Sequence, residues 1–274
     1  MKSLFGILTI IFVLCAVDAK AQNVNKNRPQ DSGWNVTVGA GGLVSPTYMG
    51  DDEYKFMAVP DVRITYEDKF FASVQEGVGF NVMNTAHWKA GPLLRYDFGR
   101  DEDGDSIFRV GGDKADDLRG LGDVDGTVEL GAFAEYTMQP LSAKIEILQG
   151  IGGHEGLIGS AEIKYNGRAQ LQQNAIIYAF GPEIEFSDSN YHDAYFGVNA
   201  NQSTASGLER YDADSGVLSY GIGASAIIPV TDEVSTVLFA NYSHLGEEAA
   251  NSSLVETRGS EHQGVAGLFV NYSF

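Results

Sequence analysis

Cysteine is nearly missing from this chain of 274 residues, which contains one, Cys15. That residue falls in a short apolar stretch near the N-terminus. Leu14 stands before it, where lipid attachment to a cysteine requires a small residue. We therefore interpret Cys15 as part of an export signal. The rest of the chain then has no thiol, which excludes disulfides, cysteine nucleophiles and cysteine metal sites.

Residues 1–21 have the three parts of a cleaved export signal. Lys2 supplies the positive start, an almost unbroken apolar run covers residues 4–17, and Ala19-Lys20-Ala21 offers the small-x-small cleavage pattern. The run is shorter than the stretch that a membrane-spanning helix needs, which argues against the alternative of a signal anchor. The sequence thus predicts two regions, a signal peptide at 1–21 and one mature domain at 22–274.

Basic residues are scarce, with 18 Lys and Arg against 37 Asp and Glu and a formal net charge of −19. Nucleic acid binding needs a basic face, so no nucleic acid partner is expected. Such acidity is typical of solvated loops. On a bacterial surface, acidic loops can also share divalent cations with lipopolysaccharide, an alternative that charge alone leaves open.

Long apolar runs are also absent after residue 21, so no transmembrane helix is expected. Apolar and polar residues alternate instead, in segments of about ten residues separated by turns, which is the weaker pattern of a membrane β-barrel. The clearest segment is 86–98. One face is apolar with aromatic residues at both ends, and the other carries His87, Lys89, Arg95 and Asp97. In a membrane barrel the apolar face would meet lipid.

Twelve such segments predict an all-β fold, a single closed transmembrane β-barrel with antiparallel strands. An even count suits a barrel with both termini in the periplasm. Ten strands are the alternative, because the alternation is imperfect in two segments, and a soluble β-sandwich is the competing fold. The expected strands lie at 33–44, 59–68, 69–80, 86–98, 124–137, 141–151, 156–167, 171–186, 191–200, 215–229, 232–243 and 263–274.

The last expected strand carries an apolar row on every second residue, Leu268, Val270, Tyr272 and Phe274. A final strand with a terminal aromatic residue is typical of the signal that the barrel-assembly machinery recognises, and such a strand must pair its open edge to close the barrel. We predict from this signal a location in the outer membrane of a Gram-negative bacterium. Membrane lipid and the assembly machinery would be partners.

Motifs for catalysis and for metal binding are not evident. None of the five histidines has a ligand spacing such as HExxH. Ser243 and His244 are adjacent in a strand, so they point to opposite faces and cannot form a nucleophile–base pair. A calcium loop counted from Asp101 would have Ser106 and Gly112 where an EF-hand needs glycine and glutamate. We expect no enzyme activity, no cofactor and no metal site, with loose cation binding by this acidic loop as the alternative.

Charged side chains occupy the polar face of the expected strands and should point into the lumen. Their mixed signs suit a narrow interior filled by ion pairs, and equally a wider pore that uses charge as a filter. The sequence does not separate the two, because pairing depends on strand register. The set consists of Asp61, Arg63, Glu67, Lys89, Arg95, Asp97, Glu129, Glu135, Lys144, Glu146, Glu162 and Lys164.

Several motifs follow one another along the chain: PTYMGDDEY at 46–54, YDFGR at 96–100, LRGLGD at 118–123, YFGV at 195–198 and LGEEAANSSLV at 245–255. Together they resemble the OmpV family, also called the MltA-interacting-protein (MipA) family, over nearly the whole mature chain. Ser253 departs from the pattern, since the family is expected to have proline there. That difference concerns the shape of the last loop.

The resemblance implies an outer-membrane barrel without catalytic residues. Members of the family are described as scaffolds that link a lytic transglycosylase to a murein synthase, and others as osmotic-response or adhesion proteins. The resemblance therefore implies a non-enzymatic scaffold or interaction protein with murein-processing partners. A porin-like channel for small solutes is the alternative, and an outer-membrane lipid-modifying enzyme is the least favoured of the three.

The side of the long connection at 99–122 follows from the strand count. If the N-terminus is periplasmic, the fourth expected strand ends at the periplasmic face, and this connection lies there. Its length is unusual for that side. Either it is an exception suited to a cell-wall partner, or the strand count before it is off by one. By the same parity, 201–214 and 244–262 would be extracellular.

Overall fold

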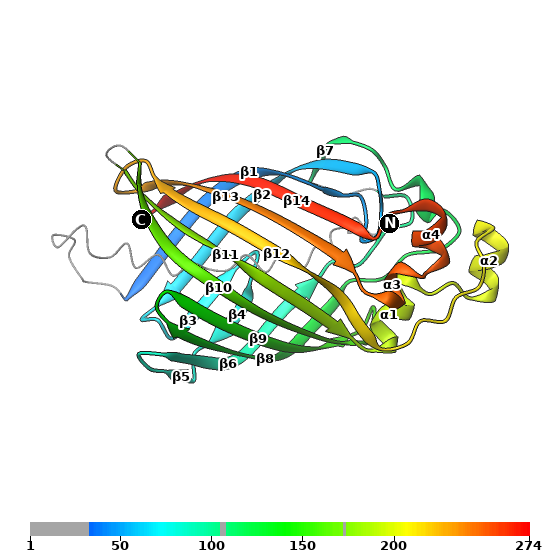
Figure 1. Cartoon of the computed structure of the whole chain (residues 1–274), viewed down its shortest axis with the longest axis horizontal. Coiled ribbons are helices and arrows are strands. Elements are labelled where there is room, and N and C mark those ends of the chain that lie inside the picture. The colour runs from blue at the N-terminus through cyan, green and yellow to red at the C-terminus, as the bar shows by residue number, and fades with distance from the viewer. Residues whose placement is uncertain (1–32, 105–107, 172–173) are drawn as a thin grey trace, which may run out of the picture.

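The strands of the protein close into a single barrel, with helices and long loops gathered at one end (Figure 1). The structure is a computed structural model that describes residues 33–104, 108–171 and 174–274, so the predicted signal peptide lies outside the described residues. Twelve antiparallel strands form the wall in this described part: β1 (Trp34–Pro46), β2 (Tyr54–Tyr66), β3 (Phe70–Ser73), β4 (Gly77–Phe80), β6 (Trp88–Asp97), β8 (Thr127–Met138), β9 (Leu141–Ile151), β10 (Leu157–Leu171), β11 (Asn174–Ser187), β12 (Gly216–Pro229), β13 (Val234–Leu245) and β14 (His262–Ser273).

Each long strand places alternate side chains on the outer and the inner face of the wall. In β6, Trp88 and Tyr96 point outward and are about half exposed, whereas Leu93 and Asp97 are buried inside. The barrel closes where β1 pairs with both β14 and β2. The prediction of a closed antiparallel barrel of twelve strands is therefore confirmed. No helix in the described ranges is both long and apolar enough to cross a membrane.

Two short strands and several short helices complete the fold. β5 (Met83–Asn84) pairs with β6, and β7 (Arg109–Gly112) pairs with the start of β2. The helices are α1 (Ser189–Phe196), α2 (Ala200–Ser206), α3 (Glu247–Ala250) and α4 (Ser253–Arg258), with a 3₁₀ turn at Asp116–Leu118. They all belong to the connections at one end of the barrel (Figure 1).

The expected strand at 191–200 is wrong, because this segment forms α1 and the start of α2. The aromatic residues of the segment favour a strand by propensity. The chain instead begins a helix at Asp188, whose side chain accepts a hydrogen bond from the backbone N–H of Tyr191. The residues that α1 buries, Tyr191, His192, Tyr195 and Phe196, recur with helical spacing, so this face packs against the barrel end.

The expected single strand at 69–80 is also wrong, since it divides into β3 and β4. Ser73 accepts a hydrogen bond from the backbone N–H of Glu76 through its hydroxyl oxygen, and Gly77 has a φ of 83°, so the chain reverses here. The two strands pair as a hairpin in the wall. The total of twelve is therefore correct although two of its members were misassigned, one strand too few at 69–80 and one too many at 191–200.

Because residues 69–80 form two strands rather than one, the connection at 99–122 lies at the opposite end of the barrel from the predicted end. Its strand β7 pairs with Lys55, Phe56 and Met57 at the start of β2, so the connection lies at the same end as the loop at 47–53. That end holds the long segments, and the opposite end holds short turns such as 139–140 and 230–233. Short turns are periplasmic in bacterial barrels. The strand count on which the prediction of a periplasmic 99–122 connection rested is therefore wrong, and the corrected count favours the extracellular side.

Candidate functional site

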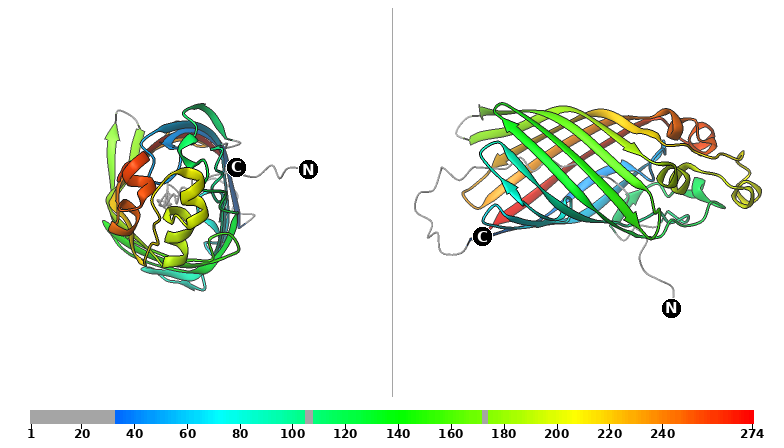
Figure 2. Two further views of the ribbon diagram at one scale, coloured as in Figure 1. Left: turned by 90° about the vertical axis from the view of Figure 1, so that its right-hand side faces the viewer. Right: turned by 90° about the horizontal axis from the view of Figure 1, so that it is seen from below.

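Four connections pack together across the extracellular end of the barrel. We call their described residues the cap, namely 47–53, 98–104 with 108–126, 188–215 and 246–261. Figure 2 shows α2 and α4 lying over this end in the view along the barrel. Two apolar clusters hold the cap. One joins Tyr191 and Phe196 of α1 to the wall, and the other joins Tyr48 and Leu118 of separate loops to Leu254 of α4. The cap is thus a packed layer rather than a set of free loops.

Buried polar groups fix the cap loop at 47–53. The Thr47 hydroxyl donates a hydrogen bond to Asp51, and the Lys55 Nζ donates to the Thr47 carbonyl oxygen at 2.6 Å. Asp51 is fully buried, and this burial raises the pKa of its carboxyl group to about 6. Burial likewise raises the pKa of Tyr48 above its usual range. The cap therefore contains a carboxyl group that titrates near neutral pH.

Contacts from α1 tie the cap to the top of the wall. The Tyr195 hydroxyl donates a hydrogen bond to Asp97, and Arg100 donates to the Tyr195 carbonyl oxygen at 2.5 Å. The rings of Tyr191 and Tyr195 both pack against His154, which belongs to the short connection between β9 and β10. These contacts place the underside of α1 directly on the buried charges of the lumen.

Asp97, Glu129 and His154 form a buried triad beneath α1. The Nε2 atom of His154 lies 3.4 Å from Glu129 and 3.8 Å from Asp97. Its Nδ1 atom accepts a hydrogen bond from the Gly156 backbone N–H at 3.0 Å, which leaves the ring proton on Nε2. A metal ligand would need a lone pair on Nε2. The arrangement fits a histidine N–H directed at two carboxylates better than a metal site.

The predicted inward charges form an ion-pair network below this triad. Arg95 Nε lies 2.6 Å from Glu129, and Arg95 Nη1 lies 3.5 Å from Glu146. Glu146 in turn lies 2.6 Å from Lys144 Nζ. Arg95, Glu129 and Glu146 are all nearly buried, so each charge depends on its partners for the interactions that water would otherwise supply.

A row of alternating charge runs around the wall on four neighbouring strands. In cross-strand register, Lys89 of β6 pairs with Glu135 of β8, Glu135 with Lys144 of β9, and Lys144 with Glu162 of β10. Lys164 adds a contact of 2.8 Å to Glu162. Opposite charges in directly opposed positions stabilise a sheet. The sequence did not determine the strand register. The observed register places these residues opposite one another in pairs of opposite charge.

Two further predicted lumen residues, both on β2, also have partners. Arg63 forms an ion pair with Glu76, which lies in the turn between β3 and β4, and Asp61 accepts a hydrogen bond of 2.7 Å from Asn271 of β14. Glu67 does not belong to the lumen. It lies in the exposed turn after β2 with a positive φ of 47° and pairs with Lys69.

Sequence reasoning missed several residues of the network. His154 lies in a turn, and Glu76 lies outside the alternating pattern, so the sequence did not indicate that either side chain faces the lumen. Glu183 and Glu185 follow the alternation of β11 and were identifiable by it. The Asn241 amide donates to Glu183, and the Ser219 hydroxyl donates to Glu185 at 2.9 Å.

Apolar side chains fill other parts of the interior. Leu43, Met57, Phe239 and Phe269 form one buried cluster from β1, β2, β13 and β14. A second cluster joins Leu93, Phe133 and Leu148, with Phe71 packed against it. A water-filled pore of a porin is lined by polar groups. The interior described here combines paired charges with packed apolar layers.

An apolar outer wall, an inner network of paired charges and short turns at one end define a transmembrane β-barrel of the outer-membrane class. Comparison with known proteins agrees with this class. The family model described as MltA-interacting protein MipA matches residues 38–274, and the chain belongs to this family.

The relatives are named as outer membrane proteins, and the chain is an outer-membrane protein. It is 27% identical over 166 residues to outer membrane protein OmpV of Vibrio cholerae, which covers 59% of this chain and 60% of that one. It is 33% identical over 91 residues to outer membrane protein Omp26La of Vibrio anguillarum, covering 33% and 34%. It is 27% identical over 115 residues to the protein named YiaT of Escherichia coli, covering 42% and 44%.

The matched segments thus span between 34% and 60% of the lengths of these relatives. Among solved structures, one titled bacterial polysaccharide outer membrane secretin aligns with 87% of this chain and 98% of its own chain, with 8% identity and a TM-score of 0.43.

Proposed function

We propose that this protein is a non-enzymatic scaffold or interaction protein of the outer membrane, and that its partners belong to the murein-processing machinery. The observation that supports a scaffold over a channel is the filled and covered interior. The cap lies across the extracellular end, and charges below it are paired at 2.6 to 3.5 Å. A charge filter for solutes would present its charges to water.

The proposal of a non-enzymatic protein is supported by the burial of the groups that resemble a catalytic pair. Ser187 Oγ lies 3.0 Å from His192 Nδ1, the spacing of a nucleophile and its base. Both residues are buried, His192 completely, and burial lowers the pKa of His192. No substrate reaches this hydroxyl while the cap is folded. The pair serves to hold the start of α1 against β11.

A murein-processing partner would bind the periplasmic rim, because murein lies in the periplasm and the connection at 99–122 lies on the other side. The rim includes the exposed turn at Glu67–Lys69 and the turn at 230–233, which contains Asp232 and Glu233. The family description, MltA-interacting protein, names a partner for the family, and we extend a partner of that kind to this chain.

The channel alternative is tested by conductance of the purified protein in planar bilayers. We expect no stable stepwise conductance. A variant that lacks residues 246–260, and with them α3 and α4, should conduct more than the intact protein if it still folds into a heat-modifiable barrel. Regular channel openings by the intact protein would contradict the scaffold proposal and support a solute channel.

The partner is tested by crosslinking in cells. A photo-reactive amino acid at Asp232 should capture a lytic transglycosylase or another murein enzyme, identified by mass spectrometry. The same group at Arg119, which is exposed in the cap, should not. Capture from Arg119 alone, or capture of no murein enzyme from any position on the periplasmic rim, would contradict the proposed partner.

A further inference from the structure

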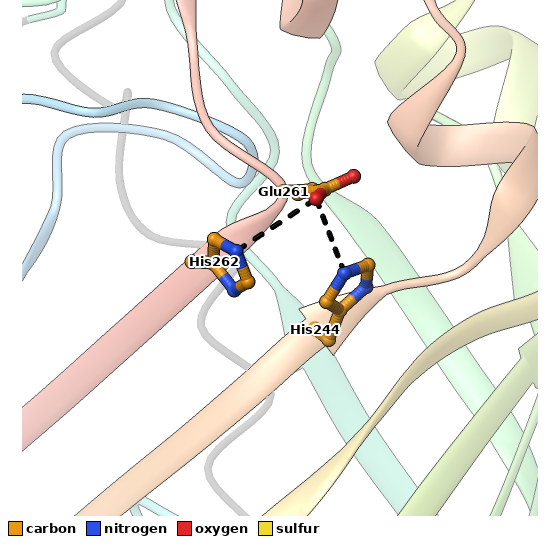
Figure 3. A group of neighbouring side chains, drawn as sticks. All are labelled: His244, Glu261 and His262. Atoms are coloured by element: carbon orange, nitrogen blue, oxygen red, sulfur yellow. Dashed lines mark ion pairs between the residues drawn. The ribbon is translucent and has the colours of Figure 1, made fainter.

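Two histidines and a glutamate meet at the extracellular rim, outside the lumen network. His244 is the penultimate residue of β13, His262 is the first residue of β14, and the two are direct partners in the register of these strands. The Glu261 carboxylate lies between the two rings (Figure 3). Its Oε1 is 3.3 Å from His244 Nε2 and 3.7 Å from His262 Nε2.

The geometry points to a binding site for a divalent transition metal ion, and we propose zinc as its occupant, held by His244 Nε2, Glu261 Oε1 and His262 Nε2. Ligand atoms about 2.0–2.2 Å from a tetrahedral zinc ion lie about 3.3–3.6 Å from one another. The His244–Glu261 distance of 3.3 Å falls in this range, and the His262–Glu261 distance of 3.7 Å is slightly longer. All three donor atoms lie within 4.8 Å of one another, so small rotations of the side chains would complete the site.

The hydrogen bonds of both rings leave Nε2 available for a metal. His244 Nδ1 lies 2.7 Å from the Leu245 carbonyl oxygen, which accepts only, so in the neutral imidazole Nδ1 carries the proton and Nε2 has the lone pair. His262 Nδ1 lies 2.8 Å from the Tyr242 hydroxyl, which can accept a hydrogen bond from it. Metal-bound histidines are oriented by a second hydrogen bond of this kind. His154 in the lumen triad has the opposite arrangement.

Aromatic neighbours hold the rings in place. The Tyr220 ring stacks on His244 with centroids 5.2 Å apart, and the Tyr242 ring stacks on His262 at 6.1 Å. The site is nevertheless open. The side chains of His244, Glu261 and His262 are 26%, 49% and 57% exposed, which leaves a fourth position for water. Two imidazole nitrogens and one carboxylate favour zinc over calcium or magnesium, which prefer oxygen ligands.

A metal at this position would join the two ends of the cap segment at 246–261, because the segment leaves the wall after β13 and returns at β14. A ligand that binds only the folded state stabilises it by mass action. Zinc should therefore stabilise the attachment of α3 and α4 to the wall. This role does not depend on whether the barrel is a scaffold or a channel.

The test uses the purified full-length protein in detergent, stripped with EDTA and titrated with zinc chloride by calorimetry. We expect one zinc ion per chain. His244→Gln and His262→Gln should each weaken binding at least about tenfold, which is the lower end of the loss that even a mutated supporting residue causes. His87→Gln is the matched control, because His87 is an exposed histidine at the opposite rim. Heat-modifiability on gels shows whether each variant is folded.

Cobalt chloride provides a second measurement, since tetrahedral Co²⁺ absorbs visible light. The absorption should appear with the intact protein and with His87→Gln, and disappear with Glu261→Gln/His262→Gln. Zinc should also raise the unfolding temperature of the intact protein and leave that of the double variant unchanged. Absence of zinc binding by the intact protein overturns the proposal. Binding that survives both single histidine variants, or that His87→Gln weakens equally, also overturns it.

Discussion

The hydroxyl of Tyr195 on α1 donates a hydrogen bond of 2.9 Å to Oδ2 of Asp97, the last residue of β6, across 98 positions of sequence. This bond joins the cap to the charged interior, because Asp97 also faces His154. The packing of the cap on the wall therefore depends on α1.

Tyr195→Phe removes this bond and leaves Asp97 with fewer partners. A buried hydrogen bond to a charged acceptor contributes about 1.5–3 kcal/mol, so the free energy of unfolding should fall by about that amount. The measurement is the urea concentration at which the folded, heat-modifiable band is lost. Tyr136→Phe is the control, since the Tyr136 hydroxyl makes only a solvent-exposed contact near the periplasmic rim. Equal effects of the two variants would show that the Tyr195 hydroxyl has no special role.

Arg95→Met leaves two nearly buried carboxylates, Glu129 and Glu146, without their shared guanidinium partner. Removal of one partner of a buried ion pair costs about 3–5 kcal/mol, and we expect the free energy of unfolding to decrease by a similar amount. Adding Glu129→Gln should recover part of the loss, because it removes one uncompensated charge. Arg119→Met should change stability little, since Arg119 is 80% exposed. A fully stable Arg95→Met protein would contradict the role given to the network.

The side of the cap can be tested with single cysteines. Arg119→Cys should react with a membrane-impermeant thiol reagent in intact cells, because the connection at 98–126 is extracellular. Asp232→Cys, in a turn at the other end, should react only after the outer membrane is permeabilised. The reverse labelling pattern would invert the orientation of the barrel and return 99–122 to the periplasm.

The stability of the cap should depend on pH through Asp51. Its folded-state pKa of about 6 lies above the usual value of 3.8, so the folded cap prefers the protonated carboxyl group. The contribution to stability is complete below pH 3.8 and is lost as the pH rises through 6, a change of about 3 kcal/mol. Asp51→Asn should remove this dependence, seen as similar unfolding temperatures at pH 5 and pH 8. An unchanged pH profile in this variant would exclude Asp51 as the titrating group.

Deletion of Phe274 should reduce assembly in cells more than stability of the folded barrel. The side chain is 71% exposed, although its backbone N–H donates to the Val36 carbonyl oxygen at 2.9 Å. We expect several-fold less protein in the outer membrane, while the variant refolded from urea into detergent stays heat-modifiable. Phe274→Tyr keeps the terminal aromatic ring and should assemble normally. Normal outer-membrane levels of the deletion variant would reject the assembly signal that comprises Leu268, Val270, Tyr272 and Phe274.

The alternation of apolar and polar residues was sufficient to predict the barrel, because a strand displays its two faces every second residue whatever its partners are. Residues 86–98 and the final strand are the clearest examples. For the same reason, eleven of the twelve predicted lumen charges lie on wall strands whose pattern alternates, and only Glu67 lies in a turn.

The tertiary structure alone decided which of these residues meet. Register determines that Lys89 opposes Glu135 and that His244 opposes His262, and register depends on pairing between segments far apart in the chain. The hairpin at 69–80 and helix α1 also escaped prediction, because short elements are specified by the packing around them as much as by their own residues. Those two elements determine the side of the cap and the covering of the lumen, which no local pattern in the sequence contains.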